Sequence, residues 1–212
     1  MVSAWLPKRM SSNPTPSRAW LLPGADFNER PIPVTRQPFR TWFRVHRASS
    51  PPILFGKSPQ HRFSHQDCPY PLLYVGATIQ TCLWEVFGDD LFQGKRTISE
   101  GKWRGSCVSQ ITVPELGLCA VTLERTRDAM SVDGASLLAA DLAVPQAWGL
   151  AVQRHPAGFH GVKYSGRFMD QPCLALFDRG TLQAQLKATV LGGLNDLDAA
   201  VDWLHERKAA LV

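Results

Sequence analysis

The sequence lacks the patterns that mark several common classes of protein. No apolar run approaches the ~20 residues of a membrane-spanning helix, and the charged, proline-containing N-terminus does not resemble a signal peptide. None of the 5 cysteines forms a CxxC pair, so a zinc site is not expected. GxSxG nucleophile motifs and the common glycine-rich phosphate loops are also missing. These absences favour a cytoplasmic protein with buried free thiols.

Acidic residues are scarce in the first third of the chain. Residues 1–62 hold Asp26 and Glu29 as their only carboxylates, while the chain as a whole carries a net charge of +5. This mildly basic balance suits an anionic ligand but does not by itself indicate nucleic-acid binding. Residues 1–38 are also rich in proline, so we expect them to form an extended basic arm without regular structure. One domain over residues 39–212 is expected to follow.

The pattern of residues 39–212 predicts an α+β fold, a compact and mostly antiparallel sheet with helices inserted between strands. Strands are expected at residues 39–47, 72–75, 106–113, 118–123, 161–164 and 172–177. Helices are expected after Thr78, at 135–142, at 145–154 and at 196–210, the last with Asp196 as its N-cap. Residues 89–105 are expected to form an exposed connection, and 182–190 a weakly helical or strand-like run.

The chain is organised around residues 70–88. Leu72 to Val75 has the length and composition of a buried strand, and Thr78 offers a hydroxyl to the first turn of a helix. Glu85 borders the apolar stripe of that helix, where Trp84 and its other neighbours reduce its hydration. Taken alone, Glu85 is more often a surface residue of an amphipathic helix, but its combination with arginines and a Tyr-Ser pair favours a functional site.

Five further residues are candidates for that site. Arg44 on the first strand and Arg62 in a Pro-rich loop could hold phosphate or carboxylate groups. Taken alone, Arg44 could equally be a solvated arginine, and a loop arginine such as Arg62 is more often one. Phe63 and Tyr74 could stack on a flat ligand, and Ser165 lies where a strand ends in a turn. The scattered histidines give no metal-ligand spacing, so no metal is expected.

Together these residues resemble the RES domain family, named for its Arg, Glu and Ser. The matching stretches are FRVHR around Arg44, FGKSPQHRFS around Arg62, YPLLYVGATIQTCLWEVF with Tyr74 and Glu85, and GVKYSGRF…PCLALFD around Ser165. The resemblance covers about residues 39–180. Its most specific part is the central strand and helix, because the Arg44 and Ser165 stretches are short and degenerate.

The resemblance implies a fold like the diphtheria-toxin type of ADP-ribosyltransferase and a toxin of a bacterial toxin–antitoxin pair that consumes NAD+. Glu85 would stabilise the oxocarbenium-like state as the nicotinamide–ribose bond breaks. Arg44 and Arg62, with Phe63, would bind the dinucleotide; Tyr74 would stack on it and Ser165 would orient Glu85 or the ribose. NAD+ is then a substrate, and no cofactor is expected. The acceptor stays open among water, phosphate and a protein side chain.

An Xre-type antitoxin, with a Cro/repressor-like DNA-binding domain, is the partner that the resemblance implies, and a homodimer is a family-level expectation. The sequence departs from the family at Val45, where many members have Tyr, and at Phe63, which has no hydroxyl. Two other functions stay open. One is a non-catalytic nucleotide- or protein-binding module of the same fold. The other is a nucleic-acid binder that uses the arm, although such arms are more often linkers, so direct DNA binding is not expected.

Overall fold

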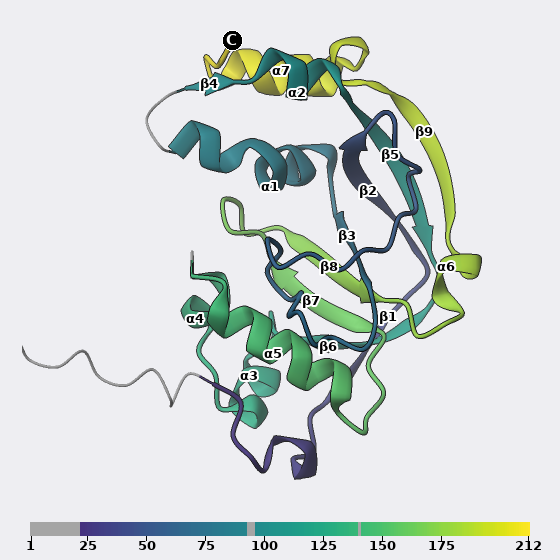
Figure 1. Ribbon diagram of the computed structural model, residues 1–212, viewed down its shortest axis with the longest axis vertical. Coiled ribbons are helices and arrows are strands. Elements are labelled where there is room, and N and C mark those ends of the chain that lie inside the picture. Colours follow the sequence, from purple (N-terminus) through teal and green to yellow (C-terminus); the bar gives the residue numbers. More distant parts are fainter. Residues whose placement is uncertain (1–21, 93–95, 140) are drawn as a thin grey trace, which may run out of the picture.

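The computed structural model describes residues 22–92, 96–139 and 141–212 (Figure 1). An 8-stranded, strongly curved sheet has the order β1-β6-β7-β8-β3-β2-β5-β9. Its neighbouring strands are antiparallel except for β6 and β7, which confirms the predicted α+β fold with a mostly antiparallel sheet. The strands are β1 (Val34–Gln37), β2 (Arg40–Arg47), β3 (Leu72–Gly76), β5 (Ser106–Val113), β6 (Leu116–Ala120), β7 (Gly161–Ser165), β8 (Pro172–Phe177) and β9 (Lys187–Gly193).

The sheet divides between β2 and β3. These two strands are joined by the single pair Phe43 and Gly76, whereas β2 pairs with β5 from Arg40 to Arg47. Because β2 and β3 diverge on either side of that pair, the sheet forms an upper half of β2, β5 and β9 and a lower half of β3, β8, β7, β6 and β1, as oriented in Figure 1. The divergence leaves room for a cleft between the halves.

Helices cover each half of the sheet separately (Figure 1). A cluster of buried residues that includes Leu83, Trp103 and Trp203 joins the upper half to its helices, and a second that includes Trp148 and Phe159 does the same below. The upper helices are α1 (Ile79–Phe92), α2 (Glu100–Arg104) and α7 (Asp198–Glu206), with the short parallel pair β4 (Thr97–Ile98) and β10 (Ala210–Leu211). The lower helices are α3 (Glu124–Met130), α4 (Gly134–Leu138) and α5 (Ala143–Arg154), and α6 (Leu182–Gln185) precedes β9.

Helix α1 begins where the sequence predicts. The Thr78 Oγ1 accepts a hydrogen bond of 3.1 Å from the backbone N–H of Thr81, which satisfies one of the free amides of the first turn. Leu83 and Phe87 are fully buried against the upper core. With this face buried, the helix presents Glu85 and, one turn later, Asp89 to the cleft.

Helix α5 holds the loop that precedes β3. The Gln146 Nε2 donates to the carbonyls of Pro59 at 2.6 Å and His61 at 3.1 Å. A Cβ atom on Gly149 would overlap the main chain of Phe63, so only glycine allows the loop to lie so close to the helix. The loop segment that carries His61 and the adjacent arginine is therefore fixed against a rigid element.

Several sequence predictions differ from the structure. Within the predicted irregular arm of residues 1–38, Val34–Gln37 forms β1, and Phe27 in a short 3-10 turn (Phe27–Glu29) is buried; residues 1–21 lie outside the described part. Residues 89–105 are not a simple connection but contain the end of α1, β4 and α2. Asp196 ends a 3-10 turn (Leu194–Asp196), so Leu197 and not Asp196 is the N-cap of α7.

The cysteines agree with their prediction. All five are free and buried, as expected for thiols that lie in apolar runs. Within residues 22–92, 96–139 and 141–212, no helix is both long enough and apolar enough to cross a membrane.

Candidate active site

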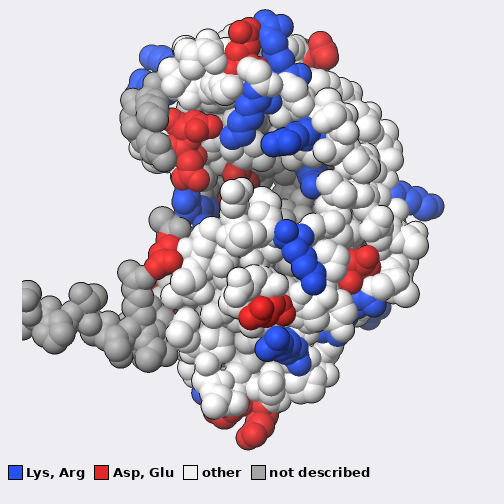
Figure 2. Space-filling model, in the orientation of Figure 1, with Lys and Arg blue, Asp and Glu red and all other residues white. Residues whose placement is uncertain are grey.

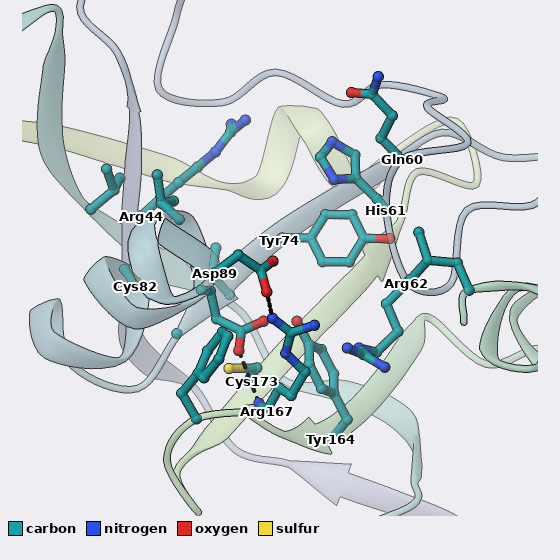
Figure 3. A pocket seen from close by; sticks show the side chains of 17 residues that line it. Arg44, Gln60, His61, Arg62, Tyr74, Cys82, Asp89, Tyr164, Arg167 and Cys173 are labelled. Atoms are coloured by element: carbon teal, nitrogen blue, oxygen red, sulfur yellow. Dashed lines mark hydrogen bonds and ion pairs between the residues drawn. The ribbon is translucent and has the colours of Figure 1, made fainter. Parts of the chain in front are cut away.

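A pocket of ≈ 350 Å³ lies in the cleft where the two halves of the sheet separate. Figure 2 shows that the surface is hollowed between the upper and lower parts, with basic and acidic side chains meeting at the hollow. The lining side chains come from β2, the loop before β3, β3, α1, the segment before α5, β7, the turn after β7, and β8 (Figure 3). Among them are four predicted site residues, Arg44, Arg62, Tyr74 and Glu85.

Glu85 is held from the turn that follows β7. Its Oε1 accepts a hydrogen bond of 3.0 Å from the backbone N–H of Arg167, and Tyr164 lines the same pocket. The side chain is open to the cleft, yet the surrounding protein displaces much of its water. This desolvation raises the pKa of Glu85, against the opposing effects of the Arg167 N–H and of the charges on Arg62 and Arg167.

The turn fits closely around this carboxylate. A Cβ atom on Gly166 would lie 3.1 Å from Glu85 Oε1 and 3.2 Å from the Met169 carbonyl oxygen. A side chain at position 166 would therefore crowd the carboxylate that Arg167 orients. Glu85 thus has a fixed position in the cleft, which a carboxylate needs if it is to stabilise charge at one atom of a substrate.

Two arginines in the pocket bond to carbonyl groups and not to carboxylates. The Arg44 Nη1 donates to the carbonyl of Pro52 at 2.7 Å, and the Arg62 Nη1 donates to those of Leu137 at 2.9 Å and Ala139 at 3.0 Å. Within the described residues neither forms an ion pair with Asp or Glu. Burial lowers the pKa of Arg44 to about 10, which leaves it positively charged at neutral pH.

Carbonyl oxygens fix the direction of these two side chains but carry no net negative charge. Each guanidinium has further N–H groups that can donate to an anion, and its planar fork matches a phosphate or carboxylate. A pair of positive charges without acidic partners in a ligand-sized pocket is therefore the main electrostatic feature of the cleft.

Tyr74 forms part of the wall between these groups. Its ring lies against the imidazole of His61, with centroids 5.3 Å apart, and both side chains line the pocket (Figure 3). The Tyr74 hydroxyl is buried and, among the described residues, has no hydrogen-bond partner. Burial raises the pKa of Tyr74, so the hydroxyl stays protonated.

His61 is a site residue that the sequence did not indicate. Burial, followed by the charge of Arg44, lowers its pKa, so the imidazole is neutral at pH 7. In this state one ring nitrogen donates and the other accepts a hydrogen bond. The sequence showed only a loop histidine, and its place beside Tyr74 depends on the fold.

Two predicted residues lie outside the pocket lining. Phe63 is buried in the lower core with its ring edge against Tyr164, at a centroid distance of 5.1 Å, so it is not positioned to stack on a ligand. Ser165 ends β7 opposite Pro172, while its neighbours Tyr164 and Arg167 line the pocket. The hydrogen bond to Glu85 that was expected of Ser165 comes instead from the backbone N–H of Arg167.

Arg167 and Asp89 are further lining residues that sequence reasoning missed. They form an ion pair between the turn after β7 and the cleft face of α1 (Figure 3). Burial, followed by the charge of Arg62, lowers the pKa of Arg167. The sequence did place Asp89 four residues after Glu85, a spacing that puts both carboxylates on one helical face.

Metal binding has no support from the described side chains. Within residues 22–92, 96–139 and 141–212, no three His, Cys, Asp or Glu residues are grouped in a way that could hold an ion.

Comparisons with known proteins give one family and one fold. The family model described as the RES domain matches residues 41–198. A chain in the crystal structure of the M. tuberculosis MbcT–MbcA toxin–antitoxin complex is similar to this chain with a TM-score of 0.60 and 19% sequence identity, over 83% of this chain and 93% of that chain. No curated protein matches the sequence. At this identity, the structural similarity is evidence of a shared fold.

Proposed function

Because the chain belongs to the RES domain family, and because its cleft sets Glu85 beside two arginines without acidic partners, we propose that it is the NAD+-consuming toxin of a toxin–antitoxin pair. The observation that carries the proposal is the meeting in one pocket of a fixed carboxylate, two cations and an aromatic wall. A dinucleotide offers a matching set of groups, with a pyrophosphate, flat bases and a ribose joined to a cationic nicotinamide.

Arg44 and Arg62 are assigned to the pyrophosphate. Both are anchored by main-chain carbonyls, so little side-chain freedom is lost when they bind an anion. The pocket of ≈ 350 Å³ lies within the range usual for small-molecule sites. Tyr74 supplies a flat surface for the nicotinamide or its ribose, and its free hydroxyl can donate to the same ligand.

Glu85 is assigned to the bond that breaks. When the bond between ribose C1′ and the nicotinamide nitrogen cleaves, its electron pair leaves with nicotinamide, which departs as a neutral molecule. Positive charge then develops on the ribose, and an ionised carboxylate stabilises it. The backbone N–H of Arg167 holds Glu85 in one orientation and opposes the rise in its pKa that burial causes.

The group that attacks C1′ defines the reaction type. Water gives ADP-ribose, inorganic phosphate gives ADP-ribose 1″-phosphate, and a protein side chain gives ADP-ribosyl transfer. All three acceptors share the same leaving group and the same carboxylate, so the pocket supports NAD+ cleavage as the common step.

We also assign a protein partner to this chain. The M. tuberculosis chain with this fold was crystallised in a toxin–antitoxin complex. By analogy, a cognate Xre-type antitoxin would bind here and neutralise the toxin. Such a partner would be detected by its co-purification with this chain and by its suppression of NAD+ loss. The predicted homodimer is a separate question, answered by the mass of the purified chain in solution.

The test of the enzymatic proposal is the loss of NAD+ over time with purified protein, measured with and without added phosphate. Glu85→Gln keeps the size of the side chain but removes its charge, and we expect the rate to fall by ~10²–10³. Glu124→Gln is the matched control, because Glu124 is exposed at the start of α3 and is not among the residues that line the pocket.

The products then identify the acceptor. Acceleration by phosphate indicates phosphorolysis, and loss at the same rate without phosphate indicates hydrolysis. Equal NAD+ loss in the parent protein and Glu85→Gln would refute the assignment of Glu85. Tight binding of NAD+ without any loss would instead identify a non-catalytic binding module of the same fold.

A further inference from the structure

Arg167 makes two separate contacts with α1 through different parts of the residue. Its backbone N–H donates to Glu85 Oε1 at 3.0 Å, while its guanidinium forms an ion pair with Asp89 one turn further along the helix. The guanidinium also lies over the ring of Phe168, at 4.2 Å from Cζ to the centroid. The main chain of Arg167 therefore binds the Glu85 carboxylate, and its side chain is not needed for that contact.

The ion pair lies at the open side of the pocket. The Asp89 side chain is 66% exposed and the Arg167 side chain is 25% exposed, and both residues line the pocket. Ion pairs with so much solvent access contribute little to stability, because water and salt compete for both charges. This pair can consequently exchange for a stronger one without disturbing the fold.

Asp89 is the only carboxylate of the described residues that pairs with a cleft arginine. Arg44 and Arg62 bond to carbonyl groups, so the third guanidinium alone has an acidic partner. A phosphate group carries at least one negative charge and, like a carboxylate, accepts two parallel N–H bonds from a guanidinium. An entering phosphate would compete directly with Asp89 for Arg167.

The turn is built so that the guanidinium can move while the backbone stays in place. The ring of Phe168 packs on Gly88 of α1, where a Cβ atom would overlap it, and it stacks on Trp84 at a centroid distance of 5.8 Å. Phe168 therefore anchors the turn to α1 independently of the ion pair. Rotation of the Arg167 side chain leaves the N–H bond to Glu85 intact.

We propose that Arg167 is a third phosphate-binding side chain of the cleft and that Asp89 is its exchangeable counterion. In the empty pocket Asp89 holds the guanidinium at the cleft opening, and a phosphate group of the ligand replaces it on binding. The inference deepens the proposed function and rests on it for the identity of the ligand. The phosphate could belong to the dinucleotide or be free inorganic phosphate, and the chemistry at Arg167 is the same.

The test is the affinity of the 212-residue chain for ADP-ribose, inorganic pyrophosphate and inorganic phosphate, measured by calorimetry at low and moderate salt. Asp89→Asn removes the competing charge at constant size, and we expect about two- to fivefold tighter binding. Arg167→Ala keeps the backbone N–H and should weaken binding about tenfold or more. Asp90→Asn is the matched control and should leave affinity unchanged, because Asp90 pairs with Lys102 and does not line the pocket.

Opposite signs for the two variants are the decisive result, since a purely structural ion pair would make both variants weaker. Unchanged or weaker binding by Asp89→Asn would overturn the inference, as would unchanged binding by Arg167→Ala. If the two substitutions change the affinity for ADP-ribose and pyrophosphate, Arg167 binds a phosphate of the dinucleotide. If they change only the affinity for inorganic phosphate, Arg167 binds a separate phosphate.

The outcome is independent of NAD+ turnover. Opposite effects on anion affinity in a chain that never consumes NAD+ would support the inference and refute the proposed enzyme. NAD+ loss that depends on Glu85 would support the proposed enzyme. If the anion affinities of Asp89→Asn and Arg167→Ala then equalled that of the parent chain, the role of Arg167 would be refuted.

Discussion

Replacing Tyr74 with phenylalanine removes one hydroxyl from the wall of the cleft and leaves the ring in place. That hydroxyl is buried and has no hydrogen-bond partner among the described residues. Its ring contact with His61 would be kept, because this contact is between the two rings and phenylalanine has the same ring. Tyr74→Phe therefore separates the cost of the unpaired oxygen from the packing of the side chain.

A buried polar atom without a partner costs about 1–3 kcal/mol in the folded state. Since Phe has no such atom, we expect Tyr74→Phe to increase the free energy of unfolding of the empty protein by about 1 kcal/mol, the lower end of that range. For a chain of 212 residues this corresponds to a rise in melting temperature of about 2–4 °C. If the hydroxyl donates to a bound nucleotide, the same change should weaken nucleotide binding severalfold.

The assay is urea or thermal unfolding of the ligand-free chain, together with the affinity for ADP-ribose. Tyr70→Phe is the control, because the Tyr70 hydroxyl is not among the buried atoms without partners and its ring packs under Arg179. Lower or equal stability of Tyr74→Phe would refute the reasoning, because it would mean that the hydroxyl already has a partner, such as a bound water, in the empty cleft.

Two further predictions concern the pH response of the site and the loop that borders it. The rate of NAD+ loss should fall as the pH drops through the pKa of Glu85. Because burial raises this pKa, the fall should occur at a higher pH than the pKa of an ordinary carboxyl group. A fall in rate at or below the ordinary carboxyl pKa range would contradict the assignment. Gly149→Ala should lower the free energy of unfolding by roughly 1–3 kcal/mol in urea titrations, because the new Cβ would overlap the main chain of Phe63. Gly56→Ala is the control, because a Cβ at position 56 would lie in open space. Equal stabilities of the two variants would show that the loop moves aside freely.

The raised pKa of Glu85 also has a consequence for stability, with a definite sign. The folded-state pKa lies above the unfolded value, so the folded chain binds the proton more tightly than the unfolded chain. Ionised Glu85 therefore opposes folding at neutral pH, and this cost disappears as the pH falls through the raised pKa. The rate of NAD+ loss should thus begin to fall at a pH where protonation of Glu85 increases the free energy of unfolding. A loss of rate at this pH therefore reports the loss of the Glu85 charge and not acid unfolding.

The central strand and helix could be predicted because their signals are local. Leu72 to Val75 is an apolar run of strand length, and Thr78 caps the helix through a bond to Thr81 that depends only on neighbouring residues. Glu85 stood out because an acid beside an apolar stripe is unusual. Local composition therefore sufficed to predict the strand and to select a carboxylate that lines the pocket.

Strand β1 could not be recognised, because its stability comes from a distant segment. Val34–Gln37 has no alternation of apolar and polar residues, and it becomes a strand by pairing with Leu116 to Cys119. The burial of Phe27 likewise depends on Trp148, whose ring lies 5.2 Å away. A proline-rich stretch lacks a local signal for such contacts, so the sequence suggested an arm where the structure has an edge strand.

The sequence also could not show whether Ser165 or Tyr164 faces the cleft. Successive residues of a strand point to opposite faces, so the residue that faces the cleft depends on register and not on side-chain chemistry. Here Tyr164 pairs with Cys173, and both line the pocket, while Ser165 pairs with Pro172. The motif was located correctly in the fold, but the pairing of β7 with β8 decides which side chains reach Glu85.

The described features of the cleft share one physical property, which is that each is unfavourable without a ligand. Arg44 is a desolvated cation without an acidic partner, Tyr74 has a buried hydroxyl without a bond, and Glu85 is a carboxylate whose surroundings disfavour its charge. A folded protein keeps such groups together only where they are needed, because nonpolar replacements would be more stable. A single ligand could meet all three residues. Its phosphate would pair with Arg44, an acceptor atom would bond to the Tyr74 hydroxyl, and its cationic ring would lie near Glu85. Such a ligand should therefore stabilise the chain more than phosphate alone, and this comparison also tests whether the three residues form one site.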